Sequence, residues 1–248
     1  MKPLLTAEIL KLRTTRTFAA LTGVAVGLSV LITVLVTILS EPERDTVLTD
    51  VFTTDTSGFF IMILAVVGIT GEWRHRTITS SLLAMPDRIR FLTAKTLAFA
   101  AAGIVLSLVI AAAVAITGFA ILAIRDLPTP GFGEWIGQVG RNAVVAALLG
   151  AMGVGLGGLV RNQVVAVVGI LVIGFAIDPT VAALAPDVGR FSPFGALPTA
   201  AADIPADDAG LPEDIDLFSP FAAIGLMLAW IGLFFAVAAA LLKARDVE

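Results

Sequence analysis

Hydrophobic residues concentrate in six long runs along the chain, separated by polar segments rich in charge, proline or glycine. About 20 residues of α-helix cross the hydrocarbon core of a bilayer, and each run approaches or exceeds that length. The pattern therefore predicts an all-α polytopic membrane protein with six transmembrane helices. The runs cover residues 18–39, 51–71, 97–124, 142–160, 163–177 with some extension, and 221–242.

The second run is the weakest of the six. Its purely apolar part, residues 59–70, would reach only about 18 Å as a helix. Either the polar segment 51–57 completes this span, or the membrane thins around it. We expect residues 51–57 to be unwound or to line an outer vestibule.

Composition places the whole chain, residues 1–248, in a single transmembrane domain. Of the residues, 58% are hydrophobic and 15% are charged, and the mean hydropathy is +0.98, outside the range of ordinary soluble domains. The absence of cysteine from the sequence excludes disulfides and cysteine metal sites. The first hydrophobic run has the length of a membrane span and is too long for the core of a cleavable signal peptide.

Lysine and arginine are distributed unevenly between the two sides of the predicted bundle. If both termini lie inside, twelve of these residues fall on the inner side and four on the outer side. Cytoplasmic loops carry the excess of such residues, so we expect a multi-pass plasma-membrane protein with both termini in the cytoplasm and an acidic extracellular loop at 178–220. The inner set is Lys2, Lys11, Arg13, Arg16, Arg74, Arg76, Arg88, Arg90, Lys95, Arg161, Lys243 and Arg245, and the outer set is Arg44, Arg125, Arg141 and Arg190.

The N-terminal arm has two faces when it is read as a helix. Leu5, Ile9 and Leu12 fall on one face, at positions i, i+4 and i+7. Lys11 and Arg13 are then available to anionic headgroups, so residues 1–17 are predicted to form an interfacial helix along the inner leaflet. The alternative is a cytosolic extension of the first span.

Ionisable residues are nearly absent from the six runs. The nearest candidates are Asp55, Arg141 and Asp178, and we interpret each as lying at a membrane surface. An ion-driven transporter normally holds a carboxylate near the midplane, which this pattern does not offer. His75 is the only histidine, and the glycine-rich stretch 150–160 has no phosphate-loop lysine. We therefore expect no catalytic residue, metal site or cofactor in this chain.

Small residues form one face of the fourth run. Gly153 and Gly157 make a GxxxG pair, and Gly150 lies on the same face. Such faces let helices approach closely. These glycines therefore serve either packing inside the bundle or contact between subunits.

The inner segment 72–96 contains a second amphipathic pattern. Ile78, Leu82 and Met85 fall at i, i+4 and i+7, and Pro86 ends that short helix. Asp87 can cap the next helix, which begins near Arg88 and continues to residue 124, about 55 Å in length. Its start therefore projects into the cytosol. The segment either transmits force from a cytosolic partner or is a basic loop that meets lipid phosphates.

The stretch GEWRHRTITSSLLAMPDRIRFLTAK resembles the loop of permease subunits in type-2 ABC exporters. The amphipathic arm, the six spans and the ending LLKARDV agree with the same family, so the resemblance covers nearly the whole chain. The matching positions in the loop are Gly71, Glu72, Arg74, Thr77, Ile78, Leu82, Pro86, Arg88, Ala94 and Lys95.

The resemblance implies a coupling helix at about residues 72–85 that docks on a separate ABC ATPase subunit, which binds ATP and Mg. Two permeases, identical or homologous, would pair with two ATPases, and re-entrant helices would follow the fifth span on the outer side. The chain would then export a lipophilic or amphipathic substrate. The docking residues would be Glu72, Arg74, Arg76, Thr77, Ile78, Leu82 and Met85.

A different class of function remains open from the sequence. The chain could instead be a non-transporting membrane scaffold or immunity component that recruits a cytosolic protein through the same inner segment. Both classes predict membrane lipids and a protein as partners, and neither predicts nucleic acid. Only the exporter predicts that the partner hydrolyses ATP.

Overall fold

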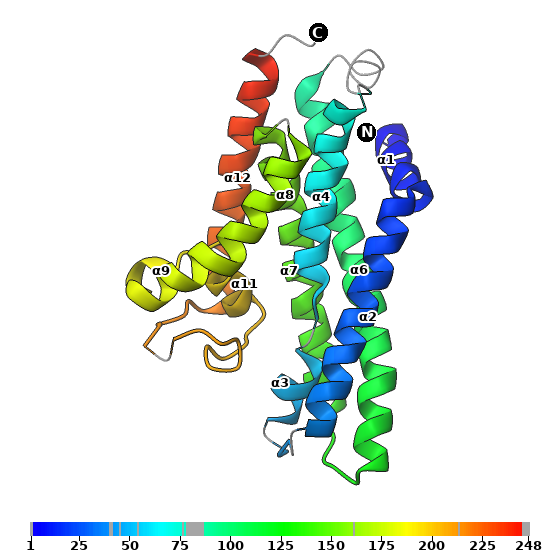
Figure 1. The fold of residues 1–248 in the computed structure, drawn as a ribbon, viewed down its shortest axis with the longest axis vertical. Helices are drawn as coiled ribbons and strands as arrows, with labels where there is room; N and C mark the ends of the chain where they lie inside the picture. Colours follow the sequence, from blue (N-terminus) through cyan, green and yellow to red (C-terminus); the bar gives the residue numbers. More distant parts are fainter. Residues whose placement is uncertain are drawn as a thin grey trace.

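The computed structural model describes residues 2–39, 42–44, 46–53, 55–75, 77, 87–160, 162–212 and 214–244. Every regular element in these ranges is helical, and six helices are long and apolar enough to cross a membrane (Figure 1). The prediction of an all-α, multi-pass membrane protein is thus confirmed. The candidate spans are Arg16–Leu39, Val47–Arg74, Arg88–Ile124, Phe132–Leu159, Gln163–Leu184 and Pro220–Ala244.

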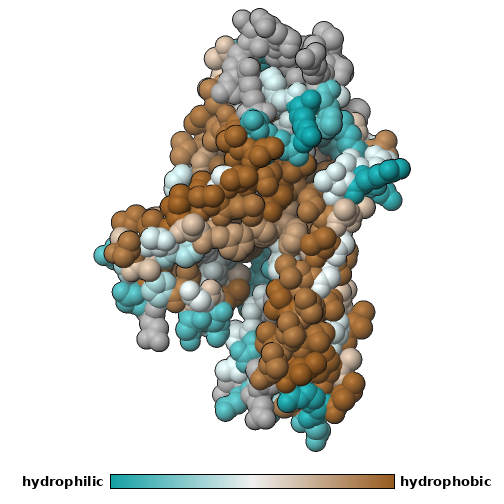
Figure 2. Space-filling model, viewed as in Figure 1, coloured by the Kyte–Doolittle hydropathy of each residue, from teal (hydrophilic) through white to brown (hydrophobic). Residues whose placement is uncertain are grey.

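The helices follow one another with short connections. They are α1 (Lys2–Thr14), α2 (Arg16–Leu39), α3 (Val47–Phe52), α4 (Ser57–Arg74), α6 (Arg88–Ile124), α7 (Phe132–Leu159), α8 (Gln163–Val172), the π-helix η1 (Ile173–Ile177), α9 (Asp178–Leu184), α10 (Pro186–Gly189), α11 (Ala196–Ala201) and α12 (Pro220–Ala244). We call the end of the bundle with α1 and the start of α6 the inner end, as the distribution of basic residues predicts. On the face seen in Figure 2, hydrophobic side chains cover most of the surface along the helices, and hydrophilic groups gather near the inner end and at the opposite end.

Polar side chains fix the ends of the long helices. The Asp87 carboxylate accepts hydrogen bonds from the backbone N–H groups of Ile89 and Arg90, both at 3.1 Å, which confirms the predicted cap of α6. Arg88 donates to the carbonyls of Leu242 and Lys243 at the inner end of α12. Such contacts satisfy carbonyls that a helix C-terminus leaves free. They tie the start of α6 to the end of α12.

The second span is interrupted, as its weak pattern predicts. Helix α3 ends at Phe52 and α4 begins at Ser57, and the described residues between them are not helical. The interruption lies within the polar segment 51–57. In Figure 1 the break separates the blue α3 from the cyan α4 beside α7.

Helix α7 lies at the centre of the bundle and packs against α4, α6 and α12. A Cβ at Gly150 would lie 2.6 Å from the Phe99 carbonyl oxygen of α6. A Cβ at Gly153 would lie 2.6 Å from the Met62 carbonyl oxygen of α4, and one at Gly157 would overlap Ile69. All three glycines therefore permit close packing between helices of this chain. Packing inside the bundle is one of the two roles that the sequence pattern allows for them.

The segment between the fifth and sixth spans differs in part from the sequence-based boundaries. The fifth helix continues through η1 and α9 to Leu184, so the expected extension beyond residue 177 runs into the segment 178–220 that the sequence pattern assigns to the outer loop. Helix α11 is buried against α12 and α7, and Figure 1 shows it beside the middle of α7. Its re-entry into a membrane stays a prediction.

Replacing Gly153 with leucine tests the close packing of α7 on α4. We expect Gly153→Leu to destabilise the protein by about 1–3 kcal/mol, because the new side chain must displace backbone. The measurement is the thermal unfolding midpoint in detergent. Gly140→Leu on the same helix is the control, because no atom lies within 4 Å of a Cβ there. Equal midpoints for the two variants would contradict this packing.

Candidate functional site

Four charged side chains from three helices meet at the inner end of the bundle. The Lys95 ammonium of α6 lies 2.8 Å from a Glu8 carboxylate oxygen of α1 and 2.7 Å from Glu72 Oε1 of α4. The Lys11 ammonium lies 2.7 Å from Glu8 Oε1 and 3.2 Å from Glu72 Oε1. Each ammonium thus contacts both carboxylates. We call these four residues the charge cluster.

The charge cluster is largely withdrawn from solvent. The side chain of Lys95 is 2% exposed, and those of Glu72 and Glu8 are 9% and 11% exposed. Two positive and two negative groups make the cluster neutral, which is the condition under which buried charges are tolerated. Removing one partner would leave a buried charge unpaired, so the four groups stabilise the structure only as a set.

The pKa shifts of Glu8 and Lys11 stabilise the packing of α1 on the bundle near neutral pH. Burial alone would raise the pKa of Glu8, but Lys95 and Lys11 hold it below its usual value. Burial alone would lower the pKa of Lys11, but the hydrogen bond to Glu8 and the charge of Glu72 raise it. The contribution of Glu8 is present above its unfolded pKa and is lost as pH falls through the lower folded value. That of Lys11 is present below its unfolded pKa and is lost as pH rises through the raised folded value.

The burial of Glu8 changes the interpretation of α1. The apolar pattern predicts that Leu5, Ile9 and Leu12 face the inner leaflet. The structure adds that Glu8 is buried inside the protein, whereas Ile9 is 40% exposed. The inward face therefore carries Leu5, Glu8 and Leu12, at i, i+3 and i+7. No local pattern marks Glu8 for burial, because its partner Lys95 lies on another helix far along the chain. Placement of α1 along a leaflet stays a prediction.

A cavity of about 720 Å³ lies beside the charge cluster. Its walls come from α1, α2, α4 and α6, with Gln163 at the start of α8. Phe18, Leu64 and Val67 line its apolar part. The charge cluster therefore borders an amphipathic hollow at the inner end of the bundle.

The residues predicted to dock a partner are only partly within the described ranges. Helix α4 continues through Arg74, so Glu72 and Arg74 belong to the second span and not to a separate helix as expected. Glu72 is buried in the charge cluster, whereas Arg74 is exposed and donates to Gln163 at 3.3 Å. The exposed Thr77 donates its backbone N–H to the Glu72 carbonyl. Arg76, Ile78, Leu82 and Met85 lie outside the described residues.

Asp55, which the sequence pattern places at a membrane surface, contacts residues inside the bundle. One carboxylate oxygen accepts the backbone N–H of Ser57 at 2.7 Å, and the other accepts the hydroxyl of Ser107 at 2.6 Å. Ser107 is buried near the middle of α6. The interruption between α3 and α4 therefore carries an acidic side chain into the interior of the bundle.

Arg141 and Asp178, the other two ionisable residues near the ends of the spans, make polar contacts with the segment that follows the fifth span. Arg141 donates to the Gln138 side chain at 2.8 Å and to the Ala202 carbonyl at 3.1 Å. Asp178 accepts a hydrogen bond from the hydroxyl of Ser192. These contacts are the kind expected of residues that hold a loop on the ends of helices.

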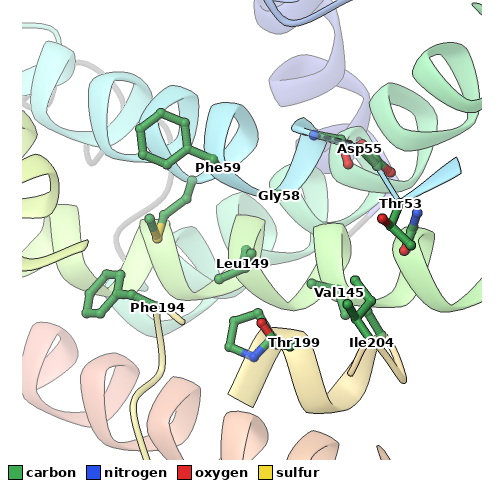
Figure 3. A pocket seen from close by; sticks show the side chains of 14 residues that line it. Thr53, Asp55, Gly58, Phe59, Val145, Leu149, Phe194, Thr199 and Ile204 are labelled. Atoms are coloured by element: carbon green, nitrogen blue, oxygen red, sulfur yellow. Dashed lines mark hydrogen bonds between the residues drawn. The ribbon is translucent and has the colours of Figure 1, made fainter. Parts of the chain in front are cut away.

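Asp55 lines a second cavity, of about 190 Å³, between α4, α7 and the α11 segment (Figure 3). Asn142 and Thr199 add polar groups to its wall, and Phe59 and Phe194 add aromatic rings. The cavity has enough space and polar groups to hold a small ligand.

Among the described residues, no group of three or more His, Asp or Glu side chains is placed to hold a metal ion. Comparison with known proteins adds no assignment, because no protein-family model and no curated protein sequence matches the chain. A function is therefore inferred from the charge cluster and the two cavities.

Removing the Lys95 charge tests the cooperation within the charge cluster. We expect Lys95→Met to destabilise the protein by about 3–5 kcal/mol, because it leaves Glu8 and Glu72 sharing the half-exposed Lys11. The measurement is again the thermal unfolding midpoint in detergent.

Two further variants make this test specific. Adding Glu72→Gln to Lys95→Met should recover part of the loss, because one Glu–Lys pair then remains. Lys243→Met, at an exposed position on α12, should leave the midpoint unchanged. A midpoint for Lys95→Met equal to that of Lys243→Met would show that the cluster contributes no stability.

Proposed function

We propose that this chain is the membrane-spanning permease subunit of an ATP-driven exporter of the type-2 ABC class. It moves a lipophilic or amphipathic substrate outward across the plasma membrane, using ATP hydrolysis by a separate subunit that binds ATP and Mg. The observation that carries this proposal is the buried charge cluster, which joins the inner ends of α1, α4 and α6.

The charge cluster lies where a cytosolic partner would act. Residues 76–86 connect α4 to α6, and Glu72 and Lys95 lie on the two sides of that connection. Their ion pair of 2.7 Å makes the two helix ends one mechanical unit. A force on the connecting segment would then move both helices, together with α1 through Glu8.

The length of α6 supports the same function. Its 37 residues extend about 55 Å, which exceeds the hydrocarbon thickness of a bilayer. It packs against α2, α4 and α7, and Arg88 at its start contacts the end of α12. Motion at the inner end of α6 would therefore reach most of the bundle.

The cavity at Asp55 favours an exporter over a scaffold. A scaffold that only recruits a cytosolic protein needs no polar, ligand-sized space between its spans. This chain holds a cavity of about 190 Å³ bordered by an acidic side chain and two phenylalanines. A buried polar group at membrane depth is costly, and chains keep such groups mainly for transport or chemistry.

The direct test is purification of the chain from its native membrane in mild detergent, with identification of the co-purifying subunits. An ABC ATPase in stable association, with hydrolysis that depends on the chain, would support the exporter. Recovery of the chain with a protein that does not hydrolyse ATP would contradict it and favour the scaffold.

A single charge in the inner segment tests the proposed docking face. We expect Ile78→Asp to reduce ATPase recovery by about tenfold, because an aspartate on an apolar docking face must be desolvated in the complex. Quantitative pull-down with the tagged chain is the measurement. Thr79→Asp is the matched control, since the helical pattern puts residue 79 on another face. Equal recovery with both variants would rule out the face formed by Ile78, Leu82 and Met85.

A further inference from the structure

The cavity at Asp55 has a charged end and an aromatic end. Figure 3 shows Asp55 and Thr53 on one side of the cavity and Phe59 and Phe194 on the other. The side chain of Leu149 lies between these two ends. The cavity is therefore amphipathic along its length, and a bound molecule would have the same polarity.

Asp55 has an acidic group without a nearby positive partner. Among the described residues, no Lys, Arg or His nitrogen forms an ion pair with its carboxylate. The groups that donate to it, the Ser57 N–H and the Ser107 hydroxyl, are neutral. Each carboxylate oxygen retains a further lone pair for another donor. An acidic group at this depth is expensive unless a cation pairs with it.

We propose that this cavity binds a monovalent organic cation of amphipathic shape. The ammonium or pyridinium group of the ligand lies against Asp55, and its ring or short chain lies against Phe59 and Phe194. The two phenylalanine rings provide apolar contact and can pack against an aromatic ring of the ligand. A volume of about 190 Å³ suits one ring with a small cationic group, since a cavity of about 150 Å³ accommodates benzene.

Other ligand classes fit this cavity less well. An anion would meet the like charge of Asp55. Calcium and magnesium ions require six or more oxygen ligands, commonly with several carboxylates, and this cavity offers one carboxylate beside neutral groups such as Asn142 and Thr199. A neutral apolar molecule would leave the carboxylate unpaired.

Two one-ring ligands of the same shape and different charge test the proposal. The full chain in lipid nanodiscs is titrated with the phenyltrimethylammonium cation, whose charge is fixed, and binding is recorded by isothermal titration calorimetry. The control ligand is tert-butylbenzene, which has the same shape and is neutral. After subtraction of empty nanodiscs, we expect the cation to bind at least about tenfold more tightly. Equal binding of the two ligands, or binding of neither, would overturn the proposal.

Matched variants connect the cation preference to Asp55. Asp55→Asn should weaken cation binding by about tenfold or more and leave binding of the neutral ligand unchanged. Asp187→Asn is the control, because Asp187 is exposed and does not line the cavity. A cation affinity of Asp55→Asn equal to that of Asp187→Asn would contradict the assignment. Phe194→Ala keeps Asp55 and should weaken binding of both ligands, and unchanged binding of both would contradict the aromatic end.

The role of this cavity as a transport site depends on the proposed exporter function. Binding by the purified chain requires no ATPase, so the two proposals fail in different experiments. If no ATPase is recovered with the chain, the exporter is contradicted and the binding result stands. If an ATPase is recovered, the cation should stimulate hydrolysis by the complex and Asp55→Asn should abolish the stimulation. Absence of stimulation would overturn the cavity as a substrate site.

Discussion

The inner half of the bundle depends on the burial of the Lys95 ammonium between two carboxylates. Lys95 is 2% exposed and contacts Glu8 of α1 and Glu72 of α4. The hydrophobic effect gives membrane helices little drive to associate, because lipid chains are as apolar as the helix faces. Close packing and polar contacts therefore hold the helices, and a helix displaced at the charge cluster would leave a buried charge without its partner. The docking of α1 and the alignment of α4 with α6 at the inner end share this one interaction.

Helix α4 connects this interaction to the deeper cavity. Glu72 lies near one end of α4, and Ser57, whose backbone N–H contacts Asp55, begins the other end. Between them α4 lies closely on α7, where Gly153 and Gly157 remove the side chains that would separate the helices. A displacement at the inner end would thus be carried along a well-packed helix to the wall of the cavity. This continuity gives the proposed exporter a physical route from partner to substrate.

Sequence patterns predicted the helices well because hydrophobic length and capping are local properties. The six spans, the cap at Asp87 and the interruption before Ser57 all follow from neighbouring residues. The charge cluster could not be predicted, because Glu8 and Lys95 are far apart in the chain and meet only when α1 docks. Positive charges were counted for sidedness alone, which hid the pairing of Lys95. The contact between Asp55 and Ser107 likewise has no local signal, because it joins two segments that are far apart in the chain.

The central claim is that α1 and α6 form one rigid unit at the inner end. The chain has no cysteine, so two spin labels can be attached through Ala7→Cys and Leu97→Cys, both at exposed positions. Pulsed electron paramagnetic resonance then gives the distribution of distances between α1 and α6. The account predicts one narrow distribution that keeps its mean and width when the co-purified partner binds ATP. A broad or two-peaked distribution in the resting protein would contradict it.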